Sequence, residues 1–243
     1  MPDTAMILAA GLGMRMRPIT ETVPKPLVAV GGKPMIDYAL QSLARQGIDN
    51  IVVNVHHLAG QIIDHLEKRP GTTISDETAE LLDSGGGIVK ALPQLGRDAF
   101  FILNADTFWL EPAGTPRGNL AVLAEAWDPD IMDILLLTAK PGQAVGYDAA
   151  GDFVSGADGR LARFDGSDQP LIYAGAAVLH PRIFADAPQG RFSLNLCFDA
   201  AISAGRLFGV AMHGLWLTVG TPQAIGTAES AMQAFEAGHE TGR

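Results

Sequence analysis

The sequence predicts an α/β fold in which helices cover both faces of a mostly parallel central sheet. Short, almost wholly apolar runs at residues 5–10, 51–55 and 99–103 are typical of buried strands. Between them, apolar residues recur at helical spacing over residues 35–46 and 59–68. This alternation of strand and helix favours βαβ units. With 243 residues, 47% of them hydrophobic, the chain is long enough to bury a sizeable core.

Local signals place the remaining elements. Pro34 suits the first position of a helix that Gly47 ends, and Thr221 and Pro222 suit the N-cap and first position of a last helix reaching residue 237. We expect further strands at 72–75, 131–138, 171–179, 208–212 and 215–219. We expect further helices from the glycines near residue 85 to 92, at 119–127 and from Ser193 to residue 204. Residues 1–243 are predicted to form a single domain.

A stretch of different character lies around residues 140–170, where glycine and aspartate are frequent. Two short β-like pieces, 152–154 and 161–164, flank the pair Asp158-Gly159. An Asp-Gly pair between β-like runs is a good hairpin signal. We therefore expect a small β excursion here that reaches over the site.

Composition excludes several classes of protein. The net charge of −10, with a pI near 4.9, disfavours nucleic acid as a partner. No apolar run approaches the length of a membrane span, and we recognise no signal peptide. The single cysteine, Cys197, lies in an apolar segment and is expected to be a core residue. We predict a cytoplasmic protein that binds neither nucleic acid nor membrane and is a monomer or a small homo-oligomer.

The stretch most informative about function follows the first strand. Gly11 and Gly13 allow positive φ and a close backbone approach, and successive N–H groups in such a turn can bind an anion. Arg15 and Lys25 add two cations on a loop stiffened by prolines 18, 24 and 26. Met16 stands where a dinucleotide-binding fingerprint has its third glycine, and no Gly-Lys-Ser/Thr of a P-loop is present. We predict a polyphosphate site of another kind.

Two further motifs follow the glycine loop. Gly85, Gly86 and Gly87 are costly in backbone entropy, and a flat group packed on bare backbone would offset that cost. The strand at 99–103 ends in Asn104-Ala105-Asp106, and ligands of open parallel sheets bind beyond the carboxyl ends of strands. A carboxylate there is well placed for a hard divalent cation.

These motifs resemble those of a known family. The run L-A-A-G-L-G-M-R-M-R-P-I-T from Leu8, followed by P-K-P-L, resembles the opening signature of sugar-1-phosphate nucleotidyltransferases. L-D-S-G-G-G-I, N-A-D, A-G-A-A-V-L-H-P and V-G-T-P extend the match over nearly the whole chain. Within the family the chain looks most like the bacterial N-acetylmuramate α-1-phosphate uridylyltransferases of cell-wall recycling. The resemblance implies a three-layer Rossmann-like nucleotidyltransferase fold.

The resemblance also implies a reaction and its residues. A nucleoside triphosphate, UTP above all, and a sugar 1-phosphate, N-acetylmuramate α-1-phosphate above all, would give a nucleotide sugar and pyrophosphate. The nucleotide would contact Ala10, Gly11, Gly13, Met14, Arg15, Lys25, Gly85, Gly86 and Gly87. The candidate sugar contacts are Asn104, Gly142, Asp152 and Gly175. Arg15 would bind the leaving pyrophosphate, Lys25 the α-phosphate and sugar phosphate, and Asp106 would hold Mg²⁺.

One position departs from the family pattern. Many relatives carry a metal-binding aspartate directly before V-G-T, whereas this chain has Thr218, a weaker Mg²⁺ ligand. Either the metal rests on Asp106, water and phosphates, or another acid such as Asp199 helps, or activity is reduced. A transferase for another base (GTP, dTTP or CTP) or sugar phosphate, and a weakened nucleotide-sugar binding module, stay open as alternatives.

Overall fold

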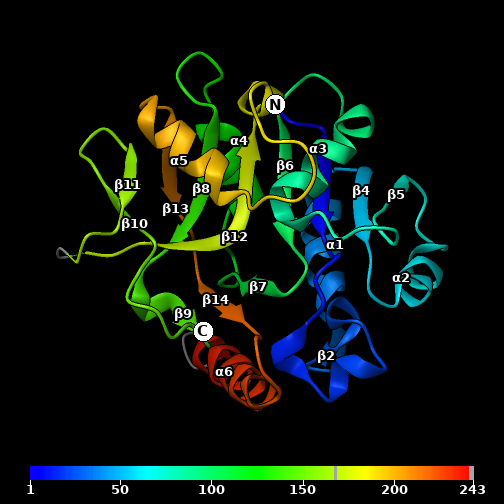
Figure 1. Cartoon of the computed structure of the whole chain (residues 1–243). Coiled ribbons are helices and arrows are strands. Elements are labelled where there is room, and N and C mark those ends of the chain that lie inside the picture. The colour runs from blue at the N-terminus through cyan, green and yellow to red at the C-terminus, as the bar shows by residue number, and fades with distance from the viewer. Residues whose placement is uncertain (167–168, 241–243) are drawn as a thin grey trace.

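A seven-stranded sheet forms the centre of the computed structural model, which describes residues 1–166 and 169–240 (Figure 1). The strand order is β13-β8-β12-β6-β1-β4-β5, and β12 alone runs antiparallel to its two neighbours, β6 and β8. The bounds are β1 Thr4–Leu8, β4 Asn50–Val55, β5 Thr72–Asp76, β6 Phe100–Asn104, β8 Ile134–Ala139, β12 Ile172–Leu179 and β13 Leu207–Ala211. The predicted mostly parallel sheet is confirmed.

Helices cover both faces of this sheet because side chains on each strand alternate between two apolar cores. In β1, Ala5 and Ile7 join one core, whereas Met6 joins the other. The first core is completed by α1 (Met35–Arg45), α2 (Ala59–Leu66) and α4 (Asn119–Ala126), and the second by α3 (Asp83–Leu95) and α5 (Asn195–Ser203). The three-layer arrangement is therefore confirmed.

A second, smaller sheet lies below the first in Figure 1, with the last helix packed against it. It consists of β7 (Thr107–Leu110), β14 (Leu215–Thr218) and β9 (Ala144–Val145), and the helix is α6 (Pro222–Glu240). The hydroxyl of Thr221 accepts a hydrogen bond from the N–H of Ala224, which confirms the predicted N-cap. Two hairpins complete the strands: β2 (Ala29–Val30) with β3 (Lys33–Pro34), and the predicted pair β10 (Phe153–Ser155) with β11 (Leu161–Arg163).

Several predicted boundaries need correction. Pro34 closes a two-residue strand, and α1 begins one residue later, at Met35. Helix α3 runs from Asp83 to Leu95, whereas it was expected to begin among the glycines and to end at residue 92. Residues 131–133 precede β8, because the N–H of Met132 turns back to the carbonyl of Asp128. Within the described ranges, no helix is both long and apolar enough to cross a membrane.

A buried carboxylate ties one edge of the sheet together. Asp133, 8% exposed, accepts hydrogen bonds from Nε of Arg182 at 2.5 Å and from Nε of Arg206 at 2.8 Å. Burial alone would raise the pKa of Asp133, but the hydrogen bonds and charges of the two guanidiniums outweigh it and lower that pKa. The stability that this cluster contributes is therefore present above the ordinary aspartate pKa and is lost as the pH falls through the lowered one.

We predict that Asp133→Ala lowers the free energy of unfolding by about 2 kcal/mol, since it leaves two partly buried guanidiniums without their carboxylate. Urea unfolding at pH 7 measures this loss. The difference in unfolding free energy between wild type and variant should shrink below about pH 4, because the carboxylate of the wild-type protein becomes protonated there. Asp199→Ala is the control, because its ion pair with Arg163 is exposed. An equal loss in both variants would contradict the account.

Candidate functional site

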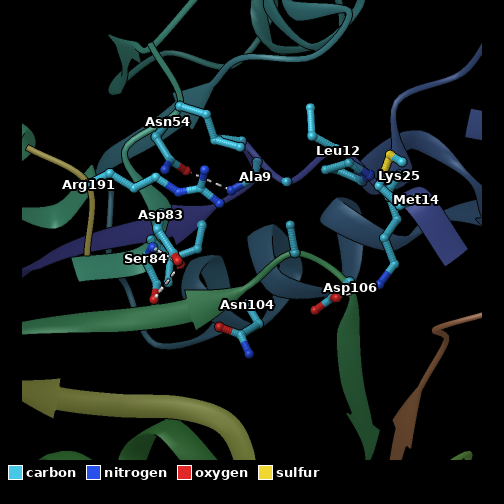
Figure 2. A pocket seen from close by; sticks show the side chains of 17 residues that line it. Ala9, Leu12, Met14, Lys25, Asn54, Asp83, Ser84, Asn104, Asp106 and Arg191 are labelled. Atoms are coloured by element: carbon cyan, nitrogen blue, oxygen red, sulfur yellow. Dashed lines mark hydrogen bonds and ion pairs between the residues drawn. The ribbon is translucent and has the colours of Figure 1, made fainter. Parts of the chain in front are cut away.

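A cleft of about 430 Å³ opens where β1, β4 and β6 end (Figure 2). Leu8, Asn54 and Asn104, near the carboxyl ends of these three strands, line it together with the loops that follow. Its volume falls within the range of small-molecule sites, and its position is the one expected in an open parallel sheet. Of the predicted nucleotide contacts, Ala10, Gly11, Gly13, Met14 and Lys25 line it.

The glycine loop forms one wall of the cleft, and its two glycines play different parts. Gly13 has φ +61°, and a Cβ there would lie 2.8 Å from Cγ2 of Thr20. The hydroxyl of Thr20 donates to the Gly13 carbonyl at 2.8 Å, so the loop is held closed at this point. Gly11 does not adopt the positive φ that glycine allows, and a Cβ there would meet no atom within 4 Å. The absence of a side chain at Gly11 therefore leaves space in the cleft.

The two charges predicted to share the phosphate site come together. Nζ of Lys25 lies 2.5 Å from Oδ2 of Asp106, and the lysine side chain is 11% exposed against 38% for the aspartate. Lys25 begins a short 3₁₀ segment (Lys25–Leu27) after Pro24, and Asp106 follows the end of β6. A loop constrained by proline thus delivers a cation to the end of a central strand.

Arg15, which was predicted to bind phosphate together with Lys25, lies outside the cleft. It is exposed in the 3₁₀ segment Met14–Met16 and does not line the cleft. Its guanidinium packs beside Gly220, where a Cβ would lie 3.3 Å from Nη2. The N–H of the adjacent Val219 donates to the carbonyl of Asp106, so Arg15 stands next to the segment that borders the Lys25–Asp106 pair.

The four predicted sugar contacts are not brought together as one group. Asn104 lines the cleft, and Gly175, with φ +73°, lies directly behind it. Asp152 instead braces the hairpin region, accepting from the Tyr147 hydroxyl and from a backbone N–H of β12. Gly142 lies exposed in the 3₁₀ segment Pro141–Gln143, outside the cleft lining. Sugar contact by these residues stays a prediction.

Gly85 and Gly86 do not line the cleft, and the structure gives a different reason for them. A Cβ on Gly85 would lie 2.3 Å from the ring of Phe192, and one on Gly86 would lie 2.2 Å from the Gly190 carbonyl oxygen. Both of their N–H groups already donate to the Phe192 carbonyl. The expectation that a flat ligand packs on this backbone is therefore corrected: the protein's own 190–194 segment packs there.

Gly87 faces a buried polar network that supports the cleft floor. A Cβ there would lie 2.5 Å from Oε1 of Glu77, which is fully buried. Oε1 accepts from Nδ2 of Asn54 at 2.7 Å, and Oε2 accepts from the N–H of Leu82 at 3.0 Å. The Asn54 oxygen accepts in turn from the N–H of Ala9. One carboxylate thus links the ends of β1 and β4 to the start of α3.

Sequence reasoning did not assign four polar residues that line the cleft: Asn54, Asp83, Ser84 and Arg191. Asn54 carried a visible signal, since it is the single polar residue in the apolar run 51–55. Arg191 carried none, because it enters the cleft from a loop more than 100 residues after Asp83, the first residue of α3. In Figure 2 its side chain extends toward Asn54 and Ala9, at the end of the cleft away from Lys25 and Asp106.

The structure removes one of the three alternatives raised by Thr218. Thr218 pairs with Thr107 across β14 and β7, next to Asp106 in the chain, and so stands where the second carboxylate was expected. Asp199 cannot replace it, because it lies on α5, paired with Arg163 and outside the cleft lining. Among the residues that the structure describes, no group of three His, Cys, Asp or Glu could hold a metal.

Comparison with known proteins identifies the family. The model of the MobA-like NTP transferase domain matches residues 5–183, which include β1, the glycine loop, α3 and Asp106. This chain belongs to the MobA-like NTP transferase family. It is therefore a nucleotidyltransferase.

Two relatives match this chain over nearly their full length. An N-acetylmuramate α-1-phosphate uridylyltransferase from Caulobacter vibrioides is 43% identical over 94% of this chain and 96% of its own. An N-acetylmuramate α-1-phosphate uridylyltransferase from Neisseria meningitidis is 33% identical over 96% of this chain and 99% of its own. Yersinia pseudotuberculosis HddC, solved with GMP-PN, shares the fold at a TM-score of 0.74 with 23% identity, covering 94% of this chain and 99% of its own.

We predict that Gly86→Ala lowers the free energy of unfolding by about 1–3 kcal/mol, because its Cβ meets a backbone carbonyl that cannot rotate away. Gly226→Ala is the matched control: it is also helical, but a Cβ there meets nothing within 4 Å. Helix propensity should make that variant about 0.5–1 kcal/mol more stable. Chemical denaturation compares the two, and a Gly86→Ala protein as stable as wild type would contradict the proposed packing.

Proposed function

We propose that this protein transfers a uridylyl group from UTP to N-acetylmuramate α-1-phosphate, with release of pyrophosphate. The observation that carries the proposal is the 43% identity, over almost the whole of both chains, to the Caulobacter uridylyltransferase. The cleft supports it with a glycine loop, an adjacent cation and a strand-end carboxylate in one place. A cytoplasmic location and a monomeric or small homo-oligomeric state are parts of the same proposal.

In this reaction an oxygen of the sugar phosphate attacks the α-phosphorus of UTP. One P–O bond forms, and the bond between the α-phosphorus and the oxygen that bridges it to the β-phosphorus breaks. That oxygen leaves as a terminal oxygen of pyrophosphate. Because the attacking phosphate is already an anion at neutral pH, no side chain has to remove a proton. The work of the protein is to position two polyanions and to offset their repulsion.

Lys25 is the group best placed to offset charge at the reacting phosphate. It is held at the edge of the cleft, with its ammonium group against Asp106. A bound α-phosphate beside this pair would share the lysine charge, and the loop N–H groups at residues 11–14 could contact the remaining phosphates. Arg15, whose guanidinium lies next to Gly220, is assigned to the leaving pyrophosphate.

Asp106 fits a role in binding Mg²⁺. Its carboxylate is a hard oxygen ligand, 38% exposed beside the phosphate end of the cleft. Mg²⁺ is commonly held by one or two carboxylates together with substrate phosphates and water, so a single aspartate suffices and Thr218 need not contribute charge. When bound, the ion supplies neutralisation of charge on the two reacting phosphates.

We predict that purified protein releases pyrophosphate with UTP, N-acetylmuramate 1-phosphate and Mg²⁺, at a greater rate than with GTP, dTTP, CTP or other sugar 1-phosphates. Asp106→Ala should abolish release, and Lys25→Ala should lower the rate by about 10²–10³, as expected for a preorganised electrostatic group. A coupled pyrophosphate assay measures both.

Matched controls are Asp98→Ala and Lys68→Ala, which change exposed residues outside the cleft and should keep full activity. Turnover only with a different nucleoside triphosphate or a different sugar 1-phosphate would contradict the assignment of UTP and N-acetylmuramate 1-phosphate as substrates. Nucleotide binding without release across the whole panel would instead support the binding-module alternative suggested by Thr218.

A further inference from the structure

The cleft has a second charged end, which the reaction described above does not use. Arg191 and Asp83 both line the cleft, and Figure 2 shows them across from Lys25 and Asp106. Both side chains belong to exposed residues, and no ion pair or hydrogen bond joins them in the described part of the chain. Two oppositely charged side chains that do not bond to each other leave a hydrogen-bond donor and an acceptor free for a ligand at this end of the cleft.

The position of Arg191 is fixed by its neighbours. Next to it, Phe192 is 6% exposed, with its ring against Gly85 and its carbonyl accepting from the N–H groups of Gly85 and Gly86 at 2.9 and 3.2 Å. The N–H of Phe192 donates to the carbonyl of Leu82. The N–H of Leu194 donates to the hydroxyl of Ser84 at 2.9 Å. The 190–194 segment is therefore docked on the first turns of α3, and Arg191 projects from a rigid base.

Asp83 is held on the same structure. It is the first residue of α3 and has φ +61°, a backbone conformation that is uncommon for residues other than glycine. Its Oδ1 accepts from the N–H of Ser84 at 2.6 Å, which fixes the orientation of the carboxylate. The hydrogen bond from Leu194 to Ser84 then links this carboxylate to the segment that carries Arg191.

We propose that Arg191 and Asp83 read the base of the nucleoside triphosphate. The guanidinium donates to a ring carbonyl oxygen, and the carboxylate accepts from the neighbouring ring N–H. Uracil presents this combination at O4 and N3–H, whereas cytosine presents an amino group and an unprotonated N3 in the same places. The proposal rests on the function proposed above, because that function puts the phosphates at the Lys25 end and thus the base at the other end.

The test is equilibrium binding of UTP and CTP, in the presence of Mg²⁺ and without sugar phosphate, measured by calorimetry. Wild type should prefer UTP. Arg191→Gln should weaken UTP binding about tenfold or more and CTP binding much less, since a charge-assisted hydrogen bond is lost only with UTP. Asp83→Asn should bring the two affinities together, because its amide can donate to N3 of cytosine. Arg97→Gln, an exposed arginine outside the cleft, is the matched control and should change neither affinity.

Three results would overturn the proposal. Equal weakening of UTP and CTP by Arg191→Gln would make Arg191 a phosphate contact. Unchanged affinities would make it a solvent-facing residue, and equal affinities in wild type would remove base reading altogether. Thermal unfolding of each variant shows whether the fold is kept. Because the assay needs no turnover, absence of pyrophosphate release would refute the proposed function while leaving the UTP-to-CTP ratio to decide base reading.

Discussion

The pairing of β1 between β4 and β6 is the constraint from which the rest of the cleft follows. All three strands run parallel, so their carboxyl ends lie at one edge of the sheet, and the last or next-to-last residue of each lines the cleft. The segment after β1 becomes the glycine loop, and the one after β6 supplies Asp106. Lys25 reaches Asp106 only because the loop after β1 folds back, through its 3₁₀ segments, across this same edge.

The buried network behind the cleft makes this edge rigid. Glu77 accepts from both Asn54 and Leu82, and Asn54 accepts from Ala9, so one carboxylate orients two strand ends and a helix start. Hydrogen bonds to a charged group contribute about 1.5–3 kcal/mol each, and leaving the buried carboxylate without them would cost at least as much. The three glycines belong to this design, since they let α3 approach both the network and the 190–194 segment. A site that must hold two polyanions in register benefits from walls that do not move.

Much of this could be predicted from sequence because the signals are local. Apolar runs ended by glycine or by Asn-Ala-Asp mark strand ends, and Gly13 marks a turn that needs positive φ. Arg191 could not be predicted, because its place depends on contact between α3 and a loop more than 100 residues further along the chain. The same contact explains why Gly85 and Gly86 were assigned to a ligand. The backbone cost of consecutive glycines was recognised, but the group that offsets it comes from the tertiary fold.

The central claim is that this cleft binds a nucleoside triphosphate with its phosphates at Lys25 and Asp106. A crystal structure with Mg²⁺ and a UTP analogue carrying a methylene bridge between its α- and β-phosphorus atoms tests it most directly. We expect the triphosphate along residues 11–14, within hydrogen-bond distance of Lys25, with the ion on Asp106 and the base beside Asp83. A nucleotide bound in the reverse direction, or in the separate cavity lined by Arg117 and His213, would contradict the account.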